Sequence, residues 1–257
     1  MVNSLTGLYL SLTVFLLLGA GFLHLTARSG EFGRKISDFF CYAPGIDLAL
    51  AYFMLLPLAI GIFFQGWRGV AIALLAELTS LWLWIILHEL THQVDKNQKI
   101  HPTLSKIVGG WRNHLAVWIT ALAIPVFWVV RFAQWIVYPP LTWLVKLPKY
   151  EAKDWVNVSR QKFEGLVGYD LIWCLYCDWM TGVWSLGSEM LRNVESFWCP
   201  IRFYSEKKCA NCQIDFPDVN NGWINAEATM KDVTQLLEEK YTSNQDQRSW
   251  FGYPERK

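Results

Sequence analysis

Long apolar runs separated by short polar segments fill the first part of the chain. A helix needs about 20 apolar residues to cross the hydrocarbon core of a bilayer. Runs of this kind cover residues 5–27, 46–65, 70–92 and 112–137. Several such windows in one chain are typical of a membrane protein and not of a soluble domain. The pattern therefore predicts an all-α, polytopic membrane protein with a bundle of four transmembrane helices in residues 1–147.

Two details of these runs predict local structure. The second and third runs are separated only by Gly66-Trp67-Arg68-Gly69, and so short a connection predicts a tight antiparallel hairpin. Pro57 lies inside the second run and predicts a kink, because proline has no N–H for the helix hydrogen bond. Arg131 lies near the end of the fourth run, where we expect its long side chain to reach the headgroups.

Residues 138–198 are harder to assign. Prolines and aromatic residues over 138–150 predict an interfacial segment that lies along the headgroups. Residues 163–191 contain no Lys or Arg and are apolar, but they include Asp170 and Asp178. Each carboxylate would cost about 2.5 to 3.5 kcal/mol near the centre of a bilayer. Residues 151–198 are therefore either a juxtamembrane helix or a fifth span, and both alternatives stay open.

The composition becomes polar after Trp198. We expect a small soluble, cysteine-containing segment over residues 199–241 and a flexible tail over residues 242–257. Within the segment, apolar residues at helical spacing predict an amphipathic helix with Asn225 as its N-cap. These apolar residues are Ile224, Met230, Val233, Leu237 and Tyr241.

Composition and charge narrow the range of partners. Hydrophobic residues make up 53% of the chain, fifteen residues are tryptophan, and the formal net charge is +1. A nearly neutral chain gives no reason to expect nucleic acid as a partner. The tryptophans favour contact with the lipid bilayer and with other membrane-protein subunits.

Basic residues predict the orientation only if a fifth span exists. With four spans, Lys and Arg are almost evenly divided between the two sides of the membrane. A fifth span would add four basic residues to the side of the loops that follow the first and third spans. That side would then be cytoplasmic, and so would the C-terminal segment of this multi-pass protein. The four residues are Arg192, Arg202, Lys207 and Lys208.

Histidines lie only at the ends of predicted spans or in the loop between the third and fourth. The third span ends in His88-Glu89-Leu90-Thr91-His92, which places both imidazoles on one side of a helix, one turn apart. The other three histidines are His24 at the exit of the first span, His101 in the loop and His114 at the start of the fourth span. We therefore expect all five on one membrane face.

The sequence His88-Glu89-Leu90-Thr91-His92 resembles the HExxH signature of the zincins. The resemblance covers five residues and implies that His88 and His92 bind zinc, with Glu89 as the general base for a metal-bound water. The third ligand would come from His24, His101 or His114. Two alternatives stay open, namely packing of the histidines at the membrane interface and contact with a haem or quinone.

Five cysteines in the second half of the chain form a second candidate site. The sequence "KKCANC" has the tight C-x-x-C spacing of zinc knuckles. We expect either a second, structural zinc or a disulfide, depending on the redox compartment. An iron–sulfur or redox role and unconnected cysteines stay open as alternatives. The residues are Cys174, Cys177, Cys199, Cys209 and Cys212.

Two acidic residues inside apolar stretches, Glu77 and Asp178, are further candidates. An intramembrane carboxylate is functional or paired by default. For Glu77 the interpretations are proton relay, substrate contact and a polar lock to a neighbouring helix.

Three functions follow from these features. The first is an integral membrane, HExxH-type metal-dependent hydrolase that acts at the membrane face. The second is a non-catalytic integral subunit of a larger membrane complex, whose zinc-stapled C-terminal segment docks partners. The third is a redox or quinone-handling membrane subunit.

Overall fold

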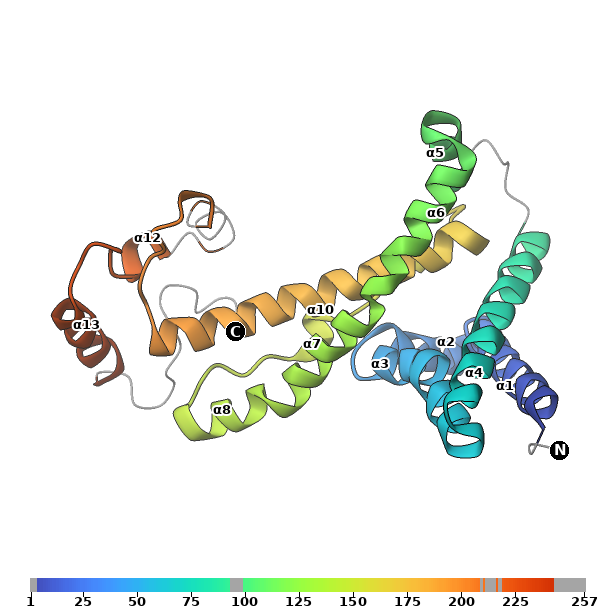
Figure 1. Cartoon of the computed structure of the whole chain (residues 1–257), viewed down its shortest axis with the longest axis horizontal. Coiled ribbons are helices and arrows are strands. Elements are labelled where there is room, and N and C mark those ends of the chain that lie inside the picture. Colours follow the sequence, from blue (N-terminus) through green and yellow to red (C-terminus); the bar gives the residue numbers. More distant parts are fainter. Residues whose placement is uncertain (1–3, 93–98, 209, 211–215, 217–218, 243–257) are drawn as a thin grey trace. The chain divides into compact units, whose positions relative to one another are not determined.

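The computed structural model describes residues 4–92, 99–208, 210, 216 and 219–242. The regular elements in these residues are all helices, and β-structure is limited to two isolated bridges (Figure 1). The predicted all-α fold is therefore confirmed. The chain divides into two compact units, which are described separately. Unit 1 comprises residues 1–123 and 152–182, and unit 2 comprises residues 124–151 and 183–257.

Unit 1 contains most of the long apolar helices. Its elements are α1 (Leu5–Thr26), α2 (Gly30–Cys41), α3 (Gly45–Leu50), the π-helical turn η1 (Ala51–Leu55), α4 (Leu56–Thr91), α5 (Ile100–Val108), α6 (Gly110–Thr120), η3 (Ala121–Ala123), α9 (Ala152–Trp155) and η4 (Arg160–Lys162). Unit 2 contains α7 (Ile124–Ile136), α8 (Tyr138–Val145), α12 (Val219–Gly222) and α13 (Met230–Thr242). One long helix, α10 (Gly168–Trp198), contributes its first part to unit 1 and its second part to unit 2.

Three helical stretches in the described residues are long and apolar enough to cross a membrane. They are Leu5–Thr26, Gly45–Thr91 and Gly110–Val145. The protein is therefore a plausible membrane protein, as its hydrophobic pattern predicts. The number of spans, four or five, stays a prediction.

The second of these stretches reverses direction at Gly66. This residue has φ +57°, a left-handed conformation that glycine adopts without steric cost. On either side of it the backbones of Gly61 and Gly69 touch, and a Cβ atom added to Gly69 would lie only 1.8 Å from the carbonyl oxygen of Gly61. The reversal falls where the four-residue connection predicts a hairpin.

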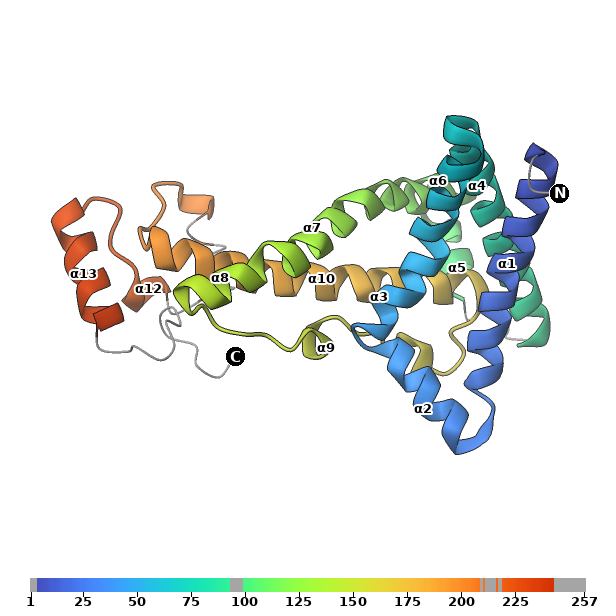
Figure 2. The ribbon, with the colours of Figure 1, turned by 90° about the horizontal axis from the view of Figure 1, so that it is seen from below.

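Helix α1 packs against α4 in both views of the ribbon (Figures 1 and 2). Small side chains at Ala73 and Ala76 let Leu8 and Leu12 pack closely, and all four are buried. A hydrogen bond between hydroxyl groups also crosses this interface, since the Tyr9 hydroxyl donates to Oγ1 of Thr79 on α4 at 3.0 Å. Small residues and interhelical hydrogen bonds are what hold helices together in lipid.

The expected irregularity at Pro57 takes the form of a π-helical turn. The turn covers Ala51–Leu55, immediately before Pro57 in the first turn of α4. Because Pro57 cannot donate to a carbonyl one turn earlier, the helix widens there. Tyr52 in this turn donates from its hydroxyl to the Phe15 carbonyl oxygen at 2.5 Å.

In unit 2, Arg131 is buried instead of reaching outward. Its side chain is 1% exposed, and a guanidinium nitrogen donates to Oε1 of Gln134 at 2.6 Å. Gln134 in turn donates to the carbonyl oxygen of Val183 at 2.7 Å. The prediction that Arg131 reaches the headgroups is therefore wrong, because α7 packs a polar face against the second part of α10.

The C-terminal part of unit 2 packs around Trp223. Phe216, Val219 and Trp223 form a buried cluster, and Leu236 of α13 packs against it. Helix α13 begins at Met230, so Ile224 lies outside the helix and Asn225 is not its N-cap. The N-terminal cap of α13 is instead formed by Thr229 and Asp232.

Candidate functional site

Three of the five histidines lie together where α1 and α4 end. The rings of His88 and His92 stack with their centroids 4.3 Å apart. The ring of His24 lies edge-on to both, at 5.7 Å from each. Of the three predicted third ligands, the structure therefore brings His24 to the His88–His92 pair.

The other two histidines form a separate group around Tyr169. The ring of His101 lies 4.6 Å from that of Tyr169, and the ring of His114 lies 5.9 Å from it. The Tyr169 hydroxyl is 3.4 Å from Nδ1 of His114. Trp82 stacks on the same tyrosine at 5.9 Å. His101 and His114 are thus part of an aromatic core in unit 1.

Glu89, the predicted general base, has two hydrogen-bond partners. Its Oε2 accepts from the Lys99 ammonium at 2.7 Å, and its Oε1 accepts from the backbone N–H of Tyr169 at 3.2 Å. Tyr169 is the second residue of α10. Because the first N–H groups of a helix have no partner inside the helix, Glu89 acts as a cap for α10.

His88 contributes to the same cap. Its Nδ1 accepts from the backbone N–H of Gly168, the first residue of α10, at 3.2 Å. A Cβ atom added to Gly168 would lie 2.1 Å from Cγ of Glu89, so the backbone of α10 approaches this side chain closely. Adjacent residues of α4 therefore bind adjacent N–H groups of α10.

These hydrogen bonds decide whether the histidines could bind a zinc ion. Zinc binds imidazole through a nitrogen lone pair. Because the Gly168 N–H donates to Nδ1 of His88, the proton of neutral His88 sits on Nε2 and no lone pair is free. The Arg28 guanidinium likewise binds Nε2 of His92, whose Nδ1 lies 3.1 Å from the His88 carbonyl oxygen. As arranged, the histidines do not fit a metal centre. Within the described residues, no group of three or more His, Cys, Asp or Glu is placed to hold a metal.

Two further carboxylates cap helices from elsewhere in unit 1. Asp170 accepts the N–H groups of Ile100 and His101, the first two residues of α5, at 2.7 and 3.0 Å. Asp178 accepts the N–H groups of Ser159 and Arg160 at the start of η4, at 2.8 and 3.2 Å. The capping role of Asp170 is not evident from the sequence, because its partners lie about 70 residues away.

Glu77 lies within α4 and remains a candidate. Its Oε1 is buried and has no hydrogen-bond partner among the residues that the structure describes. The polar lock expected for this oxygen is therefore not present in that part of the chain. Proton relay and substrate contact stay predictions.

The cysteines are divided between the two units. Cys174 and Cys177 are half-buried free thiols in unit 1, and Cys199 is an exposed free thiol in unit 2. Cys209 and Cys212 lie outside the described residues. The structural zinc and the alternative disulfide stay predictions.

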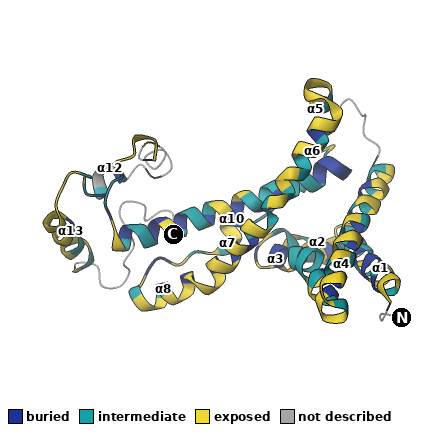
Figure 3. Ribbon diagram, in the orientation of Figure 1, coloured by how far each residue is buried: buried dark blue, intermediate teal, exposed yellow. Residues whose placement is uncertain are grey.

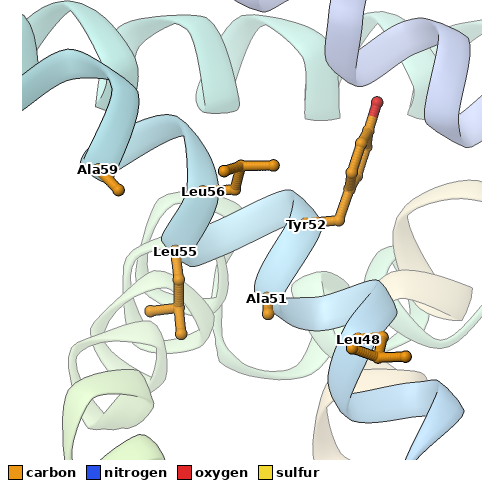
Figure 4. Close-up of a pocket in the computed structure, with 6 residues that line it drawn as sticks. All are labelled: Leu48, Ala51, Tyr52, Leu55, Leu56 and Ala59. Carbon is orange, nitrogen blue, oxygen red and sulfur yellow. The ribbon is translucent and has the colours of Figure 1, made fainter. Parts of the chain in front are cut away.

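An apolar hollow of about 460 Å³ opens beside the π-helical turn (Figure 4). Leucine and alanine side chains line it, together with the ring of Tyr52. Among the residues that line it, only Tyr52 carries a titratable group, and its hydroxyl already donates to the Phe15 carbonyl oxygen. The lining residues are Leu48, Ala51, Tyr52, Leu55, Leu56 and Ala59.

In the segment His88–His92, bonds that join helices are evident, whereas a free reactive group is not. Its side chains bind the start of α10, Lys99 next to α5, and Arg28 next to α1. No family model, no curated protein and no solved structure matches the chain.

Proposed function

We propose that the chain is a non-catalytic, multi-pass integral membrane subunit of a larger membrane assembly. The observation that carries this proposal is the use of His88 and Glu89 as acceptors for the first N–H groups of α10. A general base must be free to take a proton from its substrate or from water. Glu89 is instead held by the Lys99 ammonium. In this proposal the segment fastens α4 to α10 and performs no chemistry.

Large exposed aromatic side chains support the role as a subunit. Trp67 is 86% exposed, Trp111 71% and Trp143 80%. Exposed positions are also frequent along α4 and α7 (Figure 3). Tryptophan is enriched at membrane interfaces and at contacts between proteins. The apolar hollow at Tyr52 offers a further surface that a neighbouring helix could cover.

The proposal includes the placement of the C-terminal residues. We place residues 199–241 in the cytoplasm, where reduced cysteines at 199, 209 and 212 would favour zinc over a disulfide. A zinc-stapled segment of this kind would dock a soluble partner. The basic residues that support this orientation are Arg192, Arg202, Lys207 and Lys208. The redox or quinone-handling function stays a prediction.

Purification of the tagged full chain in a mild detergent tests the subunit role. We expect the chain to elute with other polypeptides in fixed proportion, in a particle well above its own 29.8 kDa after correction for detergent. The measurement is light scattering combined with mass spectrometry of the eluted polypeptides. Elution of the chain alone, or with copies of itself only, would contradict the proposal.

Substitution of Glu89 tests the capping role. Glu89→Gln keeps an oxygen that can accept from Tyr169, whereas Glu89→Ala removes both bonds of this side chain. We expect Glu89→Ala to lose about 1–2 kcal/mol of unfolding free energy and Glu89→Gln less than half of that. Glu31→Gln is the matched control, because the Glu31 side chain is 80% exposed. Equal losses in the Gln and Ala variants would contradict a cap.

A zinc-dependent hydrolase is the second candidate, and the position of His24 beside His88 and His92 favours it. Zinc binding would require His88 to release the Gly168 N–H. If this candidate is right, metal analysis of the purified protein gives one zinc that His88→Ala removes. Glu89→Gln should then keep the zinc and lose hydrolysis of a generic peptide substrate.

A further inference from the structure

Arg28 and three histidines form a basic cluster at the ends of two candidate membrane spans. We call Arg28, His24, His88 and His92 the Arg–His cluster. Helix α1 ends at Thr26, two residues before Arg28, and α4 ends directly before His92. The ends of membrane-spanning helices lie at the depth of the lipid headgroups. The cluster is therefore placed where phosphate groups of lipids are abundant.

The hydrogen bonds of His92 fix the direction of donation within the cluster. The Arg28 guanidinium can only donate, so Nε2 of His92 must accept from it. Nδ1 of His92 then carries the proton, and it lies 3.1 Å from the carbonyl oxygen of His88. Both contacts agree with one neutral tautomer. The other N–H groups of Arg28 remain available to a ligand.

His88 adds a second donor. Because its Nδ1 accepts from the Gly168 N–H, its Nε2 carries a proton. None of the described residues accepts a hydrogen bond from this N–H group. The ring nitrogens of His24 likewise have no recorded hydrogen bond to a described residue. The cluster thus offers N–H groups of Arg28 and His88 that have no acceptor among the described residues besides His92.

Within the described residues, no acid forms an ion pair with Arg28, the charged member of the cluster. Glu89, which follows His88 directly, faces Lys99 and Tyr169. Arg28 has no ion pair with a carboxylate in the described part of the chain, although Lys99 on the same unit has one. An exposed guanidinium with free donors favours an anion, and its planar fork matches two phosphate oxygens.

We propose that the Arg–His cluster binds the phosphate group of an anionic membrane phospholipid. Arg28 would donate two hydrogen bonds to the phosphate, and His88 would donate from Nε2. The proposal does not depend on the non-catalytic role, because holding a lipid requires no chemistry, but it excludes a zinc ion bound by the same histidines.

Thermal unfolding of the delipidated full chain in detergent tests this site. The probes are short-chain phosphatidylglycerol, short-chain phosphatidylcholine and inorganic phosphate. We expect phosphatidylglycerol to raise the unfolding midpoint more than the other two. Arg28→Gln should weaken the apparent affinity for phosphatidylglycerol about fivefold, since one basic residue near an anionic surface contributes a factor of about that size.

Arg68→Gln is the matched control. Arg68 is exposed and lies within α4, two residues beyond the reversal at Gly66 and 20 residues before His88, and its substitution removes the same charge. We expect Arg68→Gln to keep the wild-type affinity within about twofold, a difference below 0.5 kcal/mol. Equal weakening by both substitutions would show a general effect of charge and would overturn the site.

Two further outcomes keep the proposal falsifiable. An equal shift with inorganic phosphate would assign the site to a soluble phosphate and overturn the lipid. Stoichiometric zinc that His88→Ala removes would occupy the same side chains and overturn it too. If Arg28→Gln does not fold, Arg28→Lys replaces it. Lysine keeps the charge without the fork, so we expect a loss of about twofold, and an unchanged affinity would contradict the role of Arg28.

Discussion

Helices α5 and α10 of unit 1 are capped by distant residues, whereas α13 of unit 2 is capped locally. In unit 1, α5 is capped by Asp170, which lies about 70 residues later in the chain. Helix α10 is capped by Glu89, which lies 80 residues earlier. In unit 2, α13 is capped from within its own first turn. There Oδ2 of Asp232 accepts from the N–H and the hydroxyl of Thr229, at 2.8 and 2.6 Å.

The difference shows two uses of one chemical group. The Thr229–Asp232 cap satisfies donors of the helix that contains it, so its loss affects mainly that helix. A cap supplied from another helix also joins two elements, so its loss affects the packing of the unit. Removing the distant caps should therefore lower the stability of the fold, whereas removing the local one should loosen only α13.

The largest effect is expected at Asp170. Asp170→Ala leaves the N–H groups of Ile100 and His101 without their acceptor at a position that is 8% exposed. We expect a loss of about 2–4 kcal/mol of unfolding free energy. For a chain of this size the loss lowers the thermal midpoint in detergent by about 5–10 °C. Asp170→Asn keeps one acceptor oxygen and should lose about half as much. A midpoint unchanged in Asp170→Ala would contradict the role of this cap.

An intermediate effect is expected at Asp178. Its carboxylate accepts from Ser159 and Arg160 and lies 4.0 Å from the Arg160 guanidinium. Because the Asp178 side chain is 19% exposed, water can partly replace the cap, and Asp178→Ala should lose about 1–2 kcal/mol. The same thermal midpoint provides the measurement, with Asp178→Asn as the control. A loss larger than that of Asp170→Ala would reverse the order expected here.

The smallest effect is expected at Asp232 and depends on pH. The two hydrogen bonds from Thr229 hold the pKa of Asp232 below its ordinary value of 3.8. The cap therefore stabilises α13 above that value, and the stabilisation is lost as the pH falls through the lowered pKa. Hydrogen exchange of residues 230–242 should report faster opening there below about pH 4 but not at neutral pH.

Asp232→Asn is the control for this titration. It removes the titrating group, so the exchange of residues 230–242 should lose its acid dependence once the intrinsic exchange rate is subtracted. An acid dependence that survives in Asp232→Asn would assign the effect to another group.

The helical fold follows closely from the sequence. Apolar runs of about 20 residues define membrane helices by length alone, and the four residues Gly66–Gly69 leave room only for a reversal. The start of α13 is less evident. Helical spacing extends the apolar pattern back to Ile224, whereas the Thr229-x-x-Asp232 pattern marks the actual start.

The candidate site is only partly predictable. Periodicity places His88 and His92 on one side of a helix, and the predicted common location of the helix ends brings His24 near them. The partners of Glu89 cannot be predicted in this way, because the position of α10 against α4 depends on long-range packing. The prediction for Arg131 is wrong for the same reason, because the burial of its side chain depends on packing against a helix about 50 residues later.

The start of α10 links α4 and α5 to each other in addition to the chain that connects them. The N–H groups of Gly168 and Tyr169 donate to His88 and Glu89 of α4, and Asp170 accepts from the start of α5. Lys99 binds Glu89 directly. Helices α4 and α5 are thus neighbours through side-chain bonds as well as through the chain that joins them. A protein divided between residues 92 and 99 would keep complementary surfaces on its two fragments, which makes this position the natural place to split the molecule.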